Sequence, residues 1–251
     1  MSTTTTKNIF RKIYYWAGFI ILYIILFEFL IPNSAFPKPS IIFESVISLQ
    51  GDYDFLFNLF YSLSGIYLSI IISFLLLSFS NSIWISFLER NYAVTKFLKS
   101  FLFFPLMGLL LIVVYNFPVS IVSEYILWIV FSLITLLGCV ENKLTNVKSE
   151  YIESFQSIAI RNSKMLTSIK WKLIQPEIFN SVKSLHLYLW SAVIIFEFLK
   201  NHFGIGHIYN IAFQYKDYTG IIALSFIVMV LISAGNFIIG LIKQKYFFWE
   251  Q

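Results

Sequence analysis

The sequence predicts an all-α polytopic membrane protein with six transmembrane helices. Of its 251 residues, 58% are hydrophobic and only 12% are charged, which is about half of the roughly 25% charge of a soluble domain. Six apolar runs have about the length that a helix rising 1.5 Å per residue needs to cross a bilayer. They lie at about 13–31, 55–79, 100–115, 121–140, 182–199 and 219–242. We therefore expect one transmembrane domain over residues 1–251.

The placement of the basic residues orients these spans. With both termini in the cytoplasm, all but three of the 18 Lys and Arg residues lie inside. The three exceptions are Lys38, Lys200 and Lys216. Because positive charge accumulates on the cytoplasmic side of membrane proteins, this topology is expected and the reverse is not. The placement of the basic residues thus matters more than the net charge of +5, and we expect no nucleic-acid partner.

The first apolar run and the prolines give further expectations about individual spans. The first apolar run lacks a good cleavage site and is expected to remain as an anchor. The prolines that follow it, Pro32, Pro37 and Pro39, predict an extended outer segment before a short helix at about 40–49. Pro105 falls within the third span, where neighbouring helices can satisfy the carbonyl that it frees.

The longest polar interval, 147–176, lies in a predicted cytoplasmic loop at 141–181. Ser149 is a suitable N-cap, and the apolar residues after it share one helical face up to about Ile160. A break follows, and a second short helix is expected from about Lys164 with Pro176 near its end. Two short helices joined at an angle would form a projection into the cytoplasm.

This loop resembles the EAA loop with which permease subunits of bacterial ABC importers dock on their ATP-binding subunit. Glu153, Ser154 and Phe155 take the positions of the Glu-Ala-Ala core, Ala159 stands where a Gly is expected, and Pro176 closes the segment. Phe155 is larger than the family's Ala, and about one extra helical turn precedes Pro176. The resemblance implies an ATPase-coupling loop made by Glu153, Ser154, Phe155, Ala159, Ile160, Arg161, Asn162 and Pro176.

A second resemblance, to the nitrate, sulfonate and taurine type of these permeases, lies downstream. In that type a membrane Glu precedes a Gly-Leu-Gly turn, an amphipathic helix and an acidic residue before the last span. Glu197, Gly204-Ile205-Gly206 and Asp217 follow this order here. Upstream, the segment AFPKPSIIFESVISL is similar to the family's Leu-Pro-Ser-Pro segment, so the resemblance covers about residues 36–245.

The resemblance implies a type I permease-like bundle in the bacterial cytoplasmic (inner) membrane, with lipid around it. A small solute would arrive from an external solute-binding protein and cross by alternating access. ATP and Mg would be bound by a partner ABC ATP-binding subunit, with no cofactor in this chain. A second permease chain is also implied, as a homodimer or as a heterodimer with a different permease.

Five residues are candidates for the substrate pathway or its gate. Glu197 would structure the outer gate beside Gly204 and Gly206; alternatively, it reaches headgroups or water, or pairs with Lys200. His186 and Asn236 are polar residues inside the fifth and sixth spans. They would line the path or, alternatively, make a hydrogen bond between helices.

Other function classes find less support in the sequence. A secondary transporter or channel independent of ATP is the alternative, but it predicts repeats, broken helices or a central ionisable relay, and we find no convincing repeat and no central carboxylate. A membrane enzyme would need clustered nucleophiles, bases or metal ligands, and His202 and His207 lack a third ligand. Gly204 and Gly206 lack the Lys-Ser/Thr of a phosphate loop. We expect a transport subunit that is not itself an enzyme.

Overall fold

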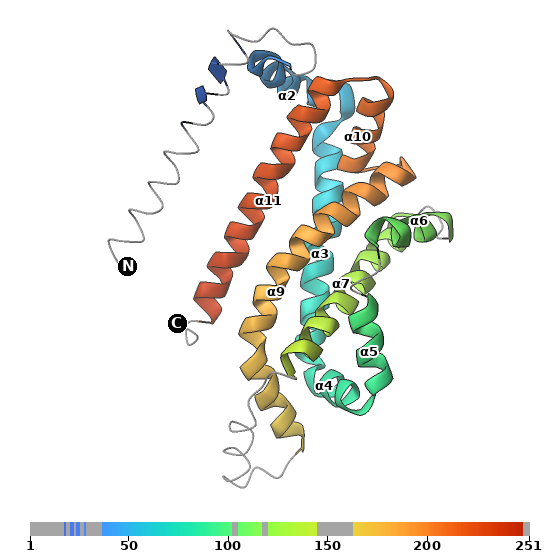
Figure 1. The fold of residues 1–251 in the computed structure, drawn as a ribbon, viewed down its shortest axis with the longest axis vertical. Helices are drawn as coiled ribbons and strands as arrows, with labels where there is room; N and C mark the ends of the chain where they lie inside the picture. The colour runs from blue at the N-terminus through green and yellow to red at the C-terminus, as the bar shows by residue number, and fades with distance from the viewer. Residues whose placement is uncertain are drawn as a thin grey trace. The chain divides into compact units, whose positions relative to one another are not determined.

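The computed structural model describes residues 37–101, 105–116, 120–144 and 163–247, together with six residues between Gly18 and Glu28. Within the four continuous ranges every regular element is an α-helix (Figure 1). The helices are α2 (Pro39–Tyr53), α3 (Phe55–Phe79), α4 (Asn81–Arg90), α5 (Tyr92–Phe101), α6 (Leu106–Asn116), α7 (Ile121–Leu144), α9 (Ser163–Lys200), α10 (Ile205–Gln214) and α11 (Tyr218–Tyr246).

Four described helices are long and apolar enough to cross a membrane. They are α3, α7, the part Thr167–Lys200 of α9, and α11. The prediction of 55–79 coincides with α3, 121–140 lies within α7, and 219–242 lies within α11. The predicted first span, 13–31, lies largely outside the described residues. The chain is thus an all-α polytopic membrane protein with four candidate spans in its described part.

The predicted span at 100–115 is wrong as a single helix. Helix α5 ends at Phe101, Pro105 is not helical, and α6 begins at Leu106. Proline lacks the N–H that a helix interior needs, so a helix starts more easily just after it than across it. The 11 residues of α6 rise only about 17 Å, less than the hydrocarbon thickness of about 30 Å.

The prediction of a short loop helix ending near Pro176 is also wrong. Helix α9 begins at Ser163 and continues for 38 residues to Lys200, with Pro176 in its interior. The predicted start of the fifth span at 182 therefore falls inside a longer helix. Trp171, Ile174 and Ile178 are buried around the proline. Their apolar burial favours a continuous helix although Pro176 removes one backbone hydrogen bond.

Packing divides the chain into two units, which we describe separately. The larger unit comprises Leu56–Asn210 and Met229–Gln251. In it α9 packs against α4, α6 and α7, and α4 and α5 pack on each other and on α7 (Figure 1). Trp128 and Trp190 are almost fully buried in its core.

Helix α3 contributes a stripe of small and polar residues to this core. Asn58, Ser62, Gly65, Ser69 and Ser73 recur at intervals of three or four and are all buried. Small residues at this spacing let neighbouring helices approach closely, and their hydroxyls and amides can bond across the gap. Ser73 does so, because its Oγ donates to the carbonyl of Ile129 on α7 at 3.0 Å.

The smaller unit comprises Met1–Phe55 and Ile211–Val228. Asp217 caps the start of α11, where its Oδ1 accepts hydrogen bonds from Thr219 Oγ1 and from the Gly220 N–H, both at 2.8 Å. The hydroxyl of Tyr53, at the end of α2, donates to Asp217 Oδ2 at 2.9 Å. This capped turn thereby joins α2 to the start of α11.

Candidate functional site

The structure describes one of the predicted coupling-loop residues. Pro176 is buried inside α9 and therefore belongs to a helix and not to the end of a loop. The other seven lie outside the described residues: Glu153, Ser154, Phe155, Ala159, Ile160, Arg161 and Asn162.

Glu197, near the end of α9, is only 1% exposed and lies in a dense set of hydrogen bonds. Ser62 Oγ on α3 lies 2.7 and 2.8 Å from its two carboxylate oxygens, and the Gly206 N–H donates to Glu197 Oε2 at 2.9 Å. The Ile205 N–H donates to Ser62 Oγ at 2.8 Å. A buried carboxylate is costly unless such donors surround it. The Glu197 carboxylate thus accepts hydrogen bonds from groups of the same chain and does not reach lipid headgroups.

Asn58 completes this arrangement from one turn earlier on α3. Its Oδ1 accepts a hydrogen bond from the Gly204 N–H at 2.8 Å. Three successive N–H groups at the start of α10 are therefore satisfied by side chains of α3 and α9. We call this set, Asn58, Ser62, Glu197 and the turn Gly204–Ile205–Gly206, the glycine latch. A helix start carries partial positive charge, so the Glu197 carboxylate is well placed there.

Both glycines of the latch are required because the end of α9 approaches their backbone too closely for a side chain. Gly204 has a φ of 100°, which L side chains rarely adopt, and a Cβ there would overlap the Glu197 carboxyl group. A Cβ on Gly206 would lie 2.6 Å from the Phe198 nitrogen. Glu197 thus contacts both glycines of the turn, and its role in an outer gate stays a prediction. The alternative pairing partner, Lys200, places its Nζ 5.4 Å from the Phe196 ring centroid.

His186 and Asn236 meet in a second polar cluster, which we call the histidine node. His186 Nδ1 lies 3.1 Å from Asn236 Oδ1, and Trp190 Nε1 donates to His186 Nε2 at 2.9 Å. The Tyr67 hydroxyl lies 3.2 Å from the same Nε2. Because indole N–H can only donate, Nε2 must be unprotonated, and Nδ1 carries the proton that goes to Asn236. The geometry matches the alternative of a hydrogen bond between helices.

Sequence reasoning missed Asn58, Ser62 and Tyr67, although a signal was present. All three are polar residues within an otherwise apolar span, and Asn58 and Ser62 are four residues apart on one helical face. This pattern indicates a buried polar face on α3. It could not indicate that the partner would be a glycine turn some 140 residues further along the chain.

One family model matches the chain. It describes the binding-protein-dependent transport system inner membrane component and covers residues 93–247, more than half of the sequence. The chain belongs to this family. No curated protein and no solved structure matches it significantly.

Membership identifies the molecule as the permease subunit of an ABC importer, a multi-pass protein of the inner membrane. ATP is bound and hydrolysed by a separate ATPase, and an external binding protein delivers the solute. The matched region contains α9, Glu197 and the glycine turn. Asn58 and Ser62, the α3 side of the glycine latch, precede that region.

Proposed function

We propose that this permease is of the nitrate, sulfonate and taurine type and couples its ATPase to solute movement through α9. The order of Glu197, Gly204-Ile205-Gly206 and Asp217 supports the type. The continuity of α9 supports the coupling and is the observation on which the proposal rests. The proposed coupling residues at 153–162 directly precede this helix.

The length of α9 suits it to transmit motion from one membrane face to the other. Its 38 residues rise about 57 Å, nearly twice the hydrocarbon thickness of about 30 Å. A helix of this length extends beyond the membrane while also crossing it. Movement of the coupling loop, as the ATPase pair closes, would therefore shift the far end of the same helix, where Glu197 lies.

Contacts near the start of α9 make it part of a larger moving body. Lys170 Nζ pairs with Glu89 on α4 at 2.5 Å, and Thr167 Oγ1 donates to Ser82 Oγ on α4 at 3.0 Å. Lys143 on α7 pairs with Glu177 at 2.5 Å. Exposed ion pairs add little stability each, but together they fix the register of α9 against its neighbours.

At the other end of α9, the glycine latch acts in this proposal as the outer gate. Its six hydrogen-bonding groups hold the start of α10 against α3 in one defined position. Packed polar networks switch between discrete arrangements. A shift of α9 would therefore break or re-form the hydrogen bonds of the latch together. The histidine node holds α3, α9 and α11 together deeper in the bundle, and His186 and Asn236 would border the path.

We further propose six spans with both termini in the cytoplasm and a single permease domain over residues 1–251. The fifteen-to-three distribution of Lys and Arg supports this topology. The third span would consist of α6 together with residues before Pro105. Reporter fusions after Gln251 and before Met1 that are active only outside the cytoplasm should both be silent; an active fusion at either end contradicts the topology.

A second permease chain completes the proposed complex, as a homodimer or with a different permease. The coupling loop departs from the family pattern at Phe155, which stands for an Ala, and at Ala159, which stands for a Gly. These departures support pairing with a second, different permease chain. Purification with the ATPase decides between them, because two copies of this chain alone with the ATPase establish the homodimer and exclude the heterodimer.

Substitution of Glu197 tests the gate. Glu197→Gln keeps the size of the side chain but replaces one acceptor oxygen by an NH₂ group that cannot accept from Ser62 or Gly206. ATP-driven uptake should fall about tenfold, since a hydrogen bond to a charged group contributes roughly 1.5–3 kcal/mol. Glu44→Gln, on an exposed residue of α2, is the matched control. Uptake by Glu197→Gln equal to wild type at equal expression would remove the gate proposal.

A further inference from the structure

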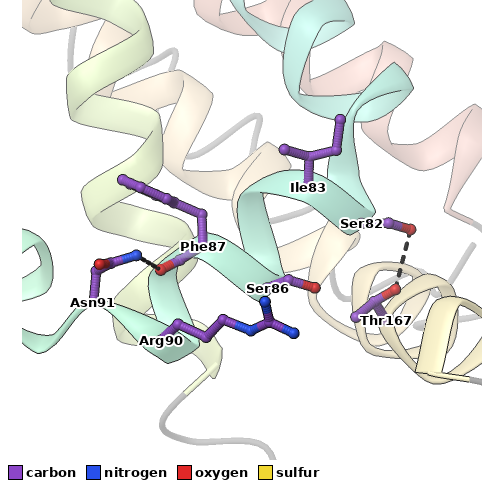
Figure 2. A pocket seen from close by; sticks show the side chains of 7 residues that line it. All are labelled: Ser82, Ile83, Ser86, Phe87, Arg90, Asn91 and Thr167. Carbon is purple, nitrogen blue, oxygen red and sulfur yellow. Dashed lines mark hydrogen bonds between the residues drawn. The ribbon is translucent and has the colours of Figure 1, made fainter.

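A cavity of about 510 Å³ lies between α4 and the first turns of α9. Figure 2 shows the side chains that line it. They are Ser82, Ile83, Ser86, Phe87, Arg90, Asn91 and Thr167. The lining includes no residue of the glycine latch or of the histidine node. Ser82 and Thr167, which line the cavity, join α4 to α9 by a hydrogen bond.

The polar part of this cavity offers hydrogen-bond donors and one positive charge. Ser82, Ser86 and Arg90 follow one another at intervals of four residues, which places them on one face of α4. Figure 2 shows the guanidinium of Arg90 beside Ser86, on the side of α4 where Thr167 lies. None of the described residues that line the cavity carries a carboxylate. The adjacent Glu89 pairs instead with Lys170 at 2.5 Å.

Among the described residues, the guanidinium of Arg90 is not engaged by a carboxylate. Within the part of the chain that the structure describes, neither ion pair includes Arg90. A guanidinium presents a planar fork of N–H groups that matches two phosphate oxygens at once. The hydroxyl group of Ser86 can donate to a further oxygen of the same phosphate. This donor set fits a phosphate-bearing anion.

Two of the exposed side chains that line the cavity are apolar. Ile83 is 70% exposed and Phe87 is 41% exposed, and both side chains line it. A soluble anion would gain nothing from these surfaces, whereas acyl chains would bury them. Helix α4 begins two residues after α3, a candidate span, ends at Phe79. The cavity is therefore close along the chain to the edge of the apolar layer.

We propose that this cavity binds the headgroup of an anionic phospholipid, with the phosphate on Arg90 and the acyl chains along Ile83 and Phe87. The proposal rests on the topology given above, which puts α4 at the cytoplasmic face, where anionic lipids attract basic residues. A bound lipid would contact α4 and α9 at their junction. It would thereby brace the part of α9 that follows the coupling loop.

Native mass spectrometry of the purified full chain in detergent tests the site, with phosphatidylglycerol and phosphatidylcholine as the two probes. We expect wild type to bind phosphatidylglycerol more tightly than phosphatidylcholine. Arg90→Gln should weaken phosphatidylglycerol binding about tenfold, and Arg90→Lys should weaken it less, because the charge remains but the fork is lost. Lys96→Gln, which removes an exposed charge on α5, is the matched control and should leave binding unchanged.

Each outcome decides the proposal. Equal binding of the two lipids by wild type, or equal losses in Arg90→Gln and Lys96→Gln, would overturn it. Inorganic phosphate forms a separate arm: displacement of the lipid by millimolar phosphate supports the shared phosphate chemistry, whereas binding of phosphate without phosphatidylglycerol overturns the lipid assignment. The assay measures neither uptake nor ATPase binding, so its failure leaves the proposed coupling through α9 untouched.

Discussion

At the scale of single residues, carboxylates recur at the starts of helices. Glu28 accepts a hydrogen bond from the Ser40 N–H near the start of α2, Glu197 from Gly206 in α10, and Asp217 from Gly220 in α11. The first N–H groups of a helix have no partner within it, and a carboxylate satisfies them while complementing the helix dipole. The positions of these three acidic residues are thus explained by the helix starts that they serve.

Gly204 provides a prediction at this scale, because it combines positive φ with contact to Glu197. Gly204→Ala should destabilise the protein by more than about 1 kcal/mol, since the backbone is strained and the new Cβ displaces the carboxyl group. Thermal unfolding in detergent measures the effect.

Gly51 supplies the control for that substitution. It lies in α2, and a Cβ there would meet nothing within 4 Å. Gly51→Ala should be neutral or stabilising by up to about 1 kcal/mol, because Ala favours a helix. Similar unfolding temperatures for the two variants would mean that the latch does not depend on Gly204.

The sequence allowed the grouping of Glu197 with the glycine turn to be predicted but not its partners on α3. The turn is local, and its two glycines and the preceding acid stand within ten residues of one another. Asn58 and Ser62 approach it only through the packing of the helices. A polar face on a span shows that a partner exists without showing which one, so the latch needed the structure.

At the scale of elements, α9 is where prediction and structure differ most. Pro176 was interpreted as the end of a loop helix because proline usually terminates helices. In the structure the buried residues on both sides of it hold one helix together. Local sequence rules give the free energy that a proline costs inside a helix. The packing of α9 against α4 and α7 supplies the stabilisation that offsets this cost. The consequence is one continuous helix from Ser163, next to the residues proposed for coupling, to the end that carries Glu197 of the glycine latch.

A helix-breaking substitution in α9 tests that connection. Lys172 is exposed and lies one turn before Pro176. Lys172→Pro should remove a second backbone hydrogen bond close to the first and cost about 3 kcal/mol of helix stability. We expect less solute transported per ATP hydrolysed, with the ATPase still bound. Lys172→Ala removes the same charge and should behave as wild type; loss of coupling in both variants would point to the charge instead.

The cap of α11 provides a prediction about pH. Burial raises the pKa of the Asp217 carboxyl, but hydrogen bonds from Gly220, Thr219 and Tyr53 outweigh it and hold that pKa below its ordinary value of 3.8. Burial, followed by the bond to Asp217, raises the pKa of the Tyr53 hydroxyl to about 12. The tyrosine therefore remains a donor, and the carboxylate an acceptor, across neutral pH.

The direction of the shift fixes how stability should change. Because the pKa of Asp217 is lower in the folded protein, its contribution is fully present above about pH 4 and is lost as the pH falls through the folded value. The unfolding temperatures of wild type and Asp217→Asn should differ by a constant amount between pH 5 and 8 and should converge below about pH 4. A difference that grows toward acid pH would contradict this assignment.

At the scale of the whole molecule, composition and charge placement were sufficient for the class of protein. An apolar chain with few charges has to be helical and membrane-embedded, because only helices satisfy their own backbone in lipid without closing a sheet. The match to the family over residues 93–247 agrees with this conclusion. Where each span begins and ends, as at Pro105 and Pro176, depended on tertiary packing that composition does not encode.

The central claim at this scale is that ATP binding by the partner changes the glycine latch through α9. The most direct measurement is the rate at which a membrane-impermeant maleimide labels His202→Cys, an exposed position two residues before the turn of the glycine latch, with Cys139 replaced by Ser. In the reconstituted complex, we expect a non-hydrolysable ATP analogue to change this rate several-fold, and Lys172→Pro, but not Lys172→Ala, to abolish the change. A labelling rate that ignores the nucleotide, or a response that survives Lys172→Pro, would contradict the claim.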